Sequence, residues 1–177
     1  EEFAPHLSSD RSLAGMSSTR HVLVVSHTAR AEAIEATVQV VNALRAAGVV
    51  PVMPASDREE FAPHLSSDLT AELGTAVSLD ELEIALVLGG DGTILRAAEL
   101  LRGSACAILG INLGHVGFLA ETEPHGLGFT VDRVLAGSYS VEERMTLEVS
   151  ATLEGRPIAE SWAVNEASVE KLGRMLD

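Results

Sequence analysis

The 177-residue sequence is poor in cysteine and in basic residues and lacks a long apolar run, and each shortage excludes a class of protein. One cysteine permits no internal disulfide and no cysteine-rich metal cluster, so we expect a reducing, cytoplasmic location. Twelve Lys and Arg against 26 Asp and Glu give a formal net charge of -14, which repels nucleic acid and anionic lipid. No apolar run reaches the roughly 18 residues of a membrane-spanning helix. We therefore expect no nucleic-acid partner and no membrane partner.

Apolar residues are nevertheless plentiful, at 46% of the chain, which is enough to bury a core. The one cysteine, Cys106, lies in the apolar stretch 104–109, where no polar neighbour in the sequence would lower its pKa. We interpret it as a small core residue rather than a nucleophile. Because the surface as a whole is acidic, an anionic ligand would have to be held locally, by backbone amides, helix ends, a few cations or a metal ion.

The first ten residues, EEFAPHLSSD, recur letter for letter at positions 59–68. A repeat architecture would show its period more than twice and with sequence drift, whereas this is one perfect copy upstream of Met16. We therefore interpret residues 1–15 as an artefactual extension and Met16 as the natural start. Peptide sequencing of the native N-terminus tests this.

From residue 20 the sequence alternates between predicted strands and predicted helices. Apolar residues recur every three or four positions between 34 and 44, which predicts a helix, and a second helix is predicted at 94–101. Four short apolar runs predict strands at 21–25, 49–53, 83–88 and 105–111, of which Pro51 suits an edge strand. This alternation predicts an α/β domain over residues 16–140, a Rossmann-like parallel sheet with helices on both faces.

After Tyr139 the pattern changes to strict alternation of apolar and polar residues over 145–154. This period of two indicates a strand with one wet face, and a turn at 155–157 leads to a second strand at 158–169. A lone hairpin is only marginally stable in water. We therefore interpret 141–177 as the start of a truncated, incomplete antiparallel β domain.

The sequence Gly-Gly-Asp-Gly-Thr at 89–93 lies where a buried strand turns into a helix, a place where free amides and the helix dipole favour phosphate. A carboxylate there is unusual, because it repels a bare phosphate. Two interpretations of Asp91 are open: a general base that accepts or orients a hydroxyl proton, or an N-cap in a tight glycine turn. Arg96 lies one turn further on and is a candidate anion partner, as are Arg30 and Arg174, although a surface role would explain all three.

A second glycine-rich turn follows the next strand, at 110–119. The Asn112 amide could contact a ribose or a base, and Phe118 could stack on adenine or belong to the core. Neither turn is a Walker A loop or a complete Gly-x-Gly-x-x-Gly fingerprint. In the late hairpin, Asn165 and Glu166 offer a donor and an acceptor that suit vicinal sugar hydroxyls, or they form an exposed polar pair.

These three segments, in this order and spacing, resemble the NAD kinase family of the bacterial type over residues 20–170. The glycine-aspartate turn alone is shared with diacylglycerol-type lipid kinases. The resemblance implies transfer of the ATP γ-phosphoryl group to the 2′-hydroxyl of the adenosine ribose of NAD, giving NADP, with a divalent metal such as Mg²⁺. It also implies a homo-oligomer in the full-length protein.

The same resemblance implies the roles of particular residues. Asp91 would be the proton acceptor, Gly92 would present its backbone to the ligand, and Arg96 would support that site. Asn165 and Glu166 would hold NAD from the second domain. We also expect ligand contacts from Gly90, Thr93, Asn112 and Phe118, and we assign no residue as a metal ligand.

The family pattern continues into a further Gly/Ser/Thr-rich nucleotide-binding motif that this sequence does not contain. We therefore expect little or no kinase activity from the 177 residues alone. Two other hypotheses stay open, a lipid kinase and a nucleotide-binding module without catalysis. The net charge of -14 and the lack of a basic amphipathic helix disfavour a lipid kinase.

Overall fold

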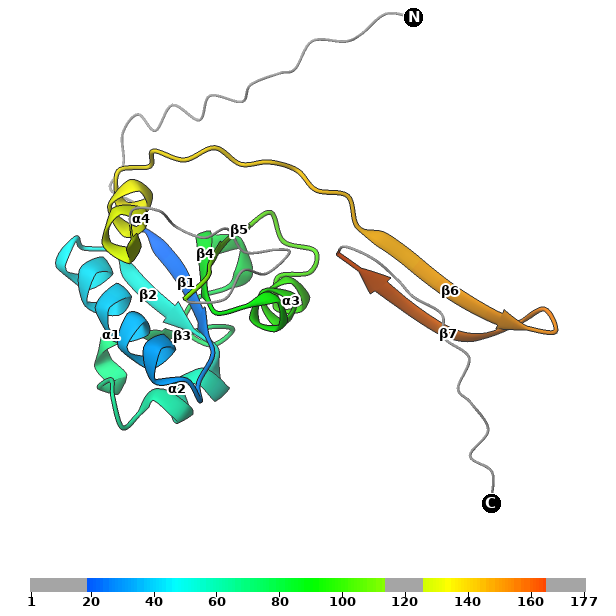
Figure 1. Cartoon of the computed structure of the whole chain (residues 1–177), viewed down its shortest axis with the longest axis horizontal. Helices are drawn as coiled ribbons and strands as arrows, with labels where there is room; N and C mark the ends of the chain where they lie inside the picture. The colour runs from blue at the N-terminus through cyan, green and yellow to red at the C-terminus, as the bar shows by residue number, and fades with distance from the viewer. Residues whose placement is uncertain (1–18, 114–125, 165–177) are drawn as a thin grey trace, which may run out of the picture.

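The computed structural model describes residues 19–113 and 126–164. They form a five-stranded sheet flanked by helices, followed by a hairpin (Figure 1). The sheet consists of β1 (His21–Ser26), β2 (Val50–Met53), β3 (Ala71–Glu72), β4 (Leu82–Leu88) and β5 (Ala107–Ile111). The helices are α1 (Ala31–Ala46), α2 (Ala55–Phe61), α3 (Asp91–Leu100) and α4 (Gly126–Leu135). The hairpin consists of β6 (Leu147–Leu153) and β7 (Arg156–Ala163).

The five-stranded sheet is entirely parallel, in the order β3-β2-β1-β4-β5. The chain moves outward from β1 through β2 to β3, and then returns to place β4 on the other side of β1. The connections that follow β1 and β4 therefore run in opposite directions. At such a switch point the carboxyl ends of the two strands open a crevice, where α/β proteins bind ligands.

Helices cover both faces of the sheet, so β1, β2 and β4 are buried along nearly their whole length and read as continuous apolar runs. On one face, α1 and α4 pack on the core through Val40, Val41, Leu44, Val131 and Val134. On the other face, α3 packs through Ile94 and Ala97, and Leu101 follows it. The predicted fold class, a parallel sheet with helices on both faces followed by antiparallel strands, is confirmed.

The predicted edge position of the strand that contains Pro51 is wrong, because β3 pairs outside it. The amide of Val50 donates to the Arg20 carbonyl on the β1 side, at 2.9 Å. Successive backbone amides of a strand point to opposite sides, so the nitrogen of Pro51 faces away from β1. On that side the pairing with β3 begins only at Val52. The proline therefore removes no hydrogen bond from the sheet.

The hairpin turn lies one residue earlier than predicted. Glu154 and Gly155 both have positive φ, at 50° and 77°, and Leu153 pairs directly with Arg156. Such a two-residue turn matches the twist of the flanking strands. Strand β7 therefore begins at Arg156 rather than at residue 158. The last residues of the predicted strand, 165–169, lie outside the described part.

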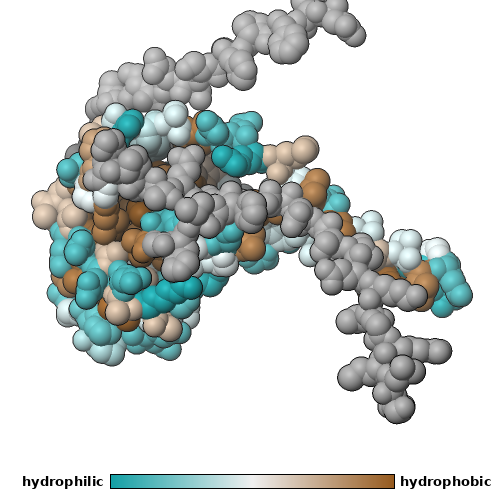
Figure 2. Space-filling model, viewed as in Figure 1, coloured by the Kyte–Doolittle hydropathy of each residue, from teal (hydrophilic) through white to brown (hydrophobic). Residues whose placement is uncertain are grey.

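Several apolar side chains of the hairpin and of the segment before it are exposed, among them Met145 at 82% and Leu153 and Ile158 at 63% (Figure 2). Among the described residues, Trp162 of the hairpin contacts the α/β unit. The Trp162 Nε1–H donates to the Glu99 carboxylate on α3, and the Arg102 guanidinium lies 5.3 Å from the centre of the Trp162 ring. On the predicted dry face of β6, Leu147, Ala151 and Leu153 are exposed and Val149 is partly buried.

The second copy of the duplicated decapeptide is an integral part of the fold. It provides the end of α2 and the turn that follows, and its Phe61 and Leu65 side chains are buried in the core on the α1 face. The first copy lies outside the described residues, so its origin stays a prediction. In the described parts of the chain, no helix is long and apolar enough to cross a membrane.

Candidate functional site

A cavity of about 570 Å³ opens at the carboxyl ends of β1 and β4, at the switch point of the sheet. One wall comes from the end of β1 and the loop after it, and the other from the glycine turn and α3. The lining residues are Ser26, His27, Thr28, Arg30, Gly90, Asp91, Gly92, Thr93 and Arg96. Five of the residues predicted for the site, from Gly90 to Arg96, therefore gather at one cavity.

The glycine turn is fixed at its first residue by a close contact within the protein. A Cβ on Gly89 would lie 2.5 Å from Thr93 Oγ1, well inside van der Waals contact. The Gly89 amide also donates to the Ile111 carbonyl of β5, at 3.1 Å. Glycine at position 89 thus allows Thr93, in the first turn of α3, to pack directly on the end of β4.

Helix α3 begins at Asp91, three residues earlier than predicted, with Gly90 as its N-cap. Gly90 is extended, and its carbonyl accepts from the amides of Thr93 at 2.9 Å and Ile94 at 3.2 Å. The interpretation of Asp91 as the N-cap is therefore wrong, because Asp91 is already the first helical residue. Its half-buried carboxylate lies beside the cavity at the positive end of the helix dipole, which favours negative charge.

Gly90 and Gly92 differ from Gly89 in having open space where a side chain would be. A Cβ at either position would meet no described atom within 4 Å, and neither residue has a positive φ. Within the described structure, neither packing nor backbone conformation requires glycine at these two positions. What the two glycines do provide is close access from the cavity to the backbone at the start of α3.

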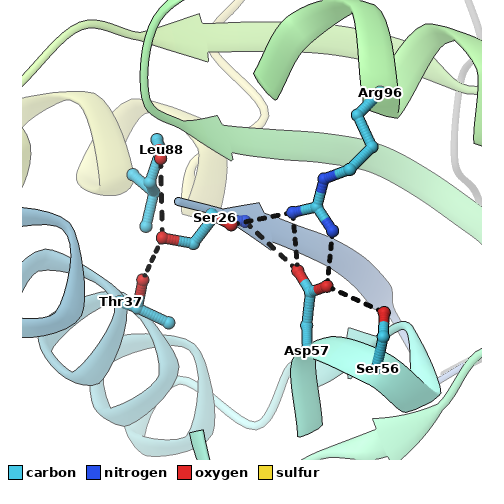
Figure 3. Close-up of polar contacts among 6 residues, drawn as sticks. All are labelled: Ser26, Thr37, Ser56, Asp57, Leu88 and Arg96. Carbon is cyan, nitrogen blue, oxygen red and sulfur yellow. Dashed lines mark hydrogen bonds and ion pairs between the residues drawn. The ribbon is translucent and has the colours of Figure 1, made fainter. Parts of the chain in front are cut away.

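Arg96 lines the cavity and is held by a buried carboxylate from α2 (Figure 3). Its two terminal nitrogens donate to Asp57 Oδ1 at 2.6 Å and to Oδ2 at 2.9 Å. One of them also donates to the Ser26 carbonyl, at 2.7 Å. The Asp57 side chain is 1% exposed and that of Arg96 is 44% exposed. The hydrogen bond from Arg96 to Asp57 raises the pKa of the guanidinium, which stays charged.

Ser26 fixes the end of β1 to the neighbouring elements. Its side chain is fully buried, and its Oγ lies 2.8 Å from the Thr37 hydroxyl of α1. The Ser26 amide lies 3.4 Å from Asp57 Oδ2. The residue that precedes the β1 loop is therefore tied to both α1 and α2 (Figure 3).

A smaller cavity of about 120 Å³ adjoins the first, and His27 and Arg30 line both. Asn112, at the carboxyl end of β5, lines it together with Gly89. The Ala29 amide donates to His27 Nδ1 at 3.2 Å, so in the neutral ring the proton is on Nε2. The structure thus places Asn112 beside the glycine turn, as the order of the strands requires.

The chain is similar to known proteins over most of its length. Residues 22–139 match the family described as the ATP-NAD kinase N-terminal domain. The chain belongs to the NAD kinase family. It is 50% identical over 162 residues to the NAD kinase of Leifsonia xyli, covering 90% of this chain and 53% of that protein. It is 43% identical over 174 residues to the NAD kinase of Thermobifida fusca, covering 93% of this chain and 53% of that protein.

A solved structure, yeast NADH kinase complexed with NADH, shares the fold with a TM-score of 0.64 at 18% sequence identity. The match covers 82% of this chain and 46% of that chain. The chain thus spans about half the length of the curated NAD kinases it matches.

Three of the predicted site residues, Phe118, Asn165 and Glu166, lie outside the described residues, as does Arg174. Sequence reasoning also missed Ser26, His27 and Thr28, which line the large cavity, and Asp57, which holds Arg96. The signal available for Asp57 was its place four residues after the end of β2. The carboxyl ends of parallel strands meet at one edge of the sheet. A polar residue shortly after any of these strands is therefore a candidate for the same site.

Proposed function

We propose that the chain acts in the transfer of the ATP γ-phosphoryl group to the 2′-hydroxyl of the adenosine ribose of NAD, giving NADP. The observation that carries the proposal is the position of Asp91, at the N-terminus of α3 and at the wall of the 570 Å³ cavity. Membership of the NAD kinase family supports the same reaction. The similar solved structure is of a yeast NADH kinase in complex with NADH, a related dinucleotide.

The proposed chemistry needs a group that orients the ribose hydroxyl and accepts its proton. In our proposal Asp91 takes this role. Because Gly90 and Gly92 on either side of it have no side chains, their backbone is open to ribose or phosphate oxygens. Arg96 and Thr93 complete this wall. Asn112 serves the adjoining small cavity, and Phe118, Asn165 and Glu166 are proposed as further contacts to the dinucleotide.

A divalent cation such as Mg²⁺ would offset the charge of the transferred phosphoryl group. Among the described residues no three His, Cys, Asp or Glu side chains form a cluster that could hold a metal ion. Asp91 is the one carboxylate among the described residues that line the large cavity. Mg²⁺ is commonly held by one or two carboxylates and the phosphates of its nucleotide, so the site fits an ion that arrives with ATP.

The test is a titration of the purified chain with NAD, together with an assay of NADP formation from NAD and ATP. We expect measurable NAD binding, and little or no turnover from the 177 residues alone. Asp91→Asn should weaken NAD binding, whereas Asp132→Asn, an exposed acid on α4, should not. Absence of NAD binding by the unchanged chain would overturn the proposal. Binding that is indifferent to Asp91→Asn would favour a nucleotide-binding module, and phosphorylation of diacylglycerol would favour a lipid kinase.

We also propose that the full-length protein is a cytoplasmic homo-oligomer. The support is the resemblance to NAD kinases and the single, partly buried cysteine. Sedimentation of the full-length protein and fractionation of the native cells test the two statements separately.

A further inference from the structure

Asp57 is a buried carboxylate that the proposed chemistry does not use. It lies in the first turn of α2 with its side chain 1% exposed, and it is paired with Arg96 of α3. The two residues are 39 positions apart in the sequence, and they meet because both follow strands of the same parallel sheet. Figure 3 shows the Asp57 carboxylate facing the two terminal nitrogens of Arg96.

The pair joins three elements at one wall of the large cavity. Arg96 donates to Asp57 on α2 and also to the carbonyl of Ser26, the last residue of β1. Ser26 is followed by the loop that lines the opposite side of the cavity, with His27 and Thr28. Arg96 itself lies on the helix that begins with Asp91. The guanidinium therefore connects α3 to the end of β1 and to α2.

Stability alone does not account for such a pair, because burying a carboxylate carries a desolvation penalty that the ion pair only roughly offsets. The same sheet carries a second bidentate pair, Arg20 with Glu83, at the opposite end of β1 and β4. There both side chains are about one third exposed, and Arg20 also donates to the last carbonyls of α4. This second pair is remote from the cavity, so the two pairs allow a stability effect to be separated from a site effect.

We propose that Asp57 is a positioning residue: its buried carboxylate holds the Arg96 guanidinium against the end of β1, and so keeps the two walls of the cavity at the spacing that a bound dinucleotide requires. The proposal rests on the proposed function for the identity of the ligand, NAD. It requires no direct contact between Asp57 and the ligand, because the carboxylate is covered by Arg96 and by α2.

The experiment measures the dissociation constant for NAD in Asp57→Asn, with Glu83→Gln as the matched control. Loss of one hydrogen bond to a charged group is expected to weaken NAD binding about tenfold in Asp57→Asn. Glu83→Gln should leave the dissociation constant unchanged, although it lowers the free energy of unfolding. A chain that is fully folded has the same affinity whatever its margin of stability, so a purely structural role for Asp57 would not move this readout.

The effect must also act through Arg96. In an Arg96→Met background, Asp57→Asn should cause no further loss of affinity, because the guanidinium that it positions is gone. If Asp57→Asn fails to fold, the double variant Asp57→Leu with Arg96→Met replaces the pair by apolar side chains and is expected to fold. That variant should lose at least tenfold in affinity, because it also removes Arg96 from the cavity wall. An unchanged dissociation constant in either variant, or an undiminished effect of Asp57→Asn in the Arg96→Met background, overturns the proposal.

A second readout needs no ligand and separates this proposal from the proposed function. In the free chain, Asp57→Asn should speed amide hydrogen exchange at 27–28 and 91–93, relative to the centre of β4, and Glu83→Gln should not. If the unchanged chain binds no NAD, the proposed function fails, and this exchange measurement alone decides whether Asp57 orders the cavity walls. Unchanged exchange at both segments overturns the positioning role.

Discussion

The hydroxyl of Thr93 occupies the space that a side chain on Gly89 would need, since a Cβ there would come within 2.5 Å of Thr93 Oγ1. Gly90 and Gly92, one and three residues further on, have no such neighbour among the described atoms. The three glycines of one turn therefore have different reasons to be glycine. The first serves the packing of α3 on β4, and the other two leave room at the cavity.

This difference predicts opposite effects of alanine at positions 89 and 92. Gly89→Ala should lower the free energy of unfolding by about 1–3 kcal/mol, because Thr93 must move. Gly92→Ala should leave that free energy unchanged or raise it by up to about 1 kcal/mol, because alanine is the better helix former. Urea unfolding of both variants measures the two changes.

The effects on NAD affinity are expected in the reverse order, with Gly92→Ala weakening binding more than Gly89→Ala. In Gly92→Ala the new methyl group enters the space beside the start of α3, so NAD binding should weaken about tenfold or more. A Gly92→Ala variant that binds NAD as well as the unchanged chain would show that the ligand does not approach this backbone. Destabilisation by Gly92→Ala as large as that by Gly89→Ala would contradict the packing difference.

The sequence carried most of the information about the sheet, because strands buried on both faces leave continuous apolar runs that need no knowledge of their partners. The glycine turn was also placed correctly, since a buried strand, a glycine-rich segment and an apolar helix follow one another in the chain. The start of α3 was misplaced. The N-cap is Gly90, and because glycine has no side chain, no capping side chain indicated it in the sequence. Asp91, the next residue, favoured a later start for the predicted helix.

The features that the sequence did not predict depend on residues far apart in the chain. Asp57 meets Arg96 only because β1 lies between β2 and β4, and no local pattern around Asp57 encodes that order. Strand β3 has two residues, which is too short for any periodicity to show. Pairing of β3 with Met53 and Val52 is nevertheless what removes β2 from the edge of the sheet.

The duplicated decapeptide provides a matched pair of phenylalanines in identical local sequence. Phe61 is 2% exposed and packs in the core on the α1 face, so Phe61→Ala should lower the free energy of unfolding by about 3–5 kcal/mol. Phe3→Ala should have no effect, because we expect residues 1–15 to be an extension outside the fold. Equal destabilisation by the two substitutions would show that the first copy is also part of the folded core.

Cys106 is predicted to be unreactive in the folded chain. Burial raises the pKa of its thiol to about 11, and its side chain packs against the core on the α3 face. The thiolate is the reactive species, so an aromatic disulfide reagent at pH 7.5 should react slowly with the native chain and quickly after unfolding in urea. Equal rates in the two states would show that the thiol is exposed. The native rate should rise as the pH is increased toward 11.

The Arg20 and Glu83 pair predicts a pH dependence of stability. The hydrogen bond from Arg20 is the main cause that lowers the pKa of Glu83 in the folded chain, and the Tyr139 hydroxyl adds a further contact at 3.2 Å. The pKa of Glu83 is lower in the folded chain than in the unfolded chain, where glutamate has a pKa of about 4.3. The ionised Glu83 therefore stabilises the fold fully at pH values above about 4.3. This stabilisation is lost as the pH falls from there through the folded-state pKa.

Glu83→Gln should therefore lower the free energy of unfolding at pH 7 by about 1 kcal/mol, a value reduced from that of a buried pair because both side chains are partly exposed. The difference between the two chains should shrink as the pH falls below about 4, since protonation of Glu83 removes the charge that the variant lacks. Urea unfolding at pH 7 and at several lower values measures it. A difference that stays constant with pH would assign the effect of Glu83→Gln to packing rather than to the ion pair.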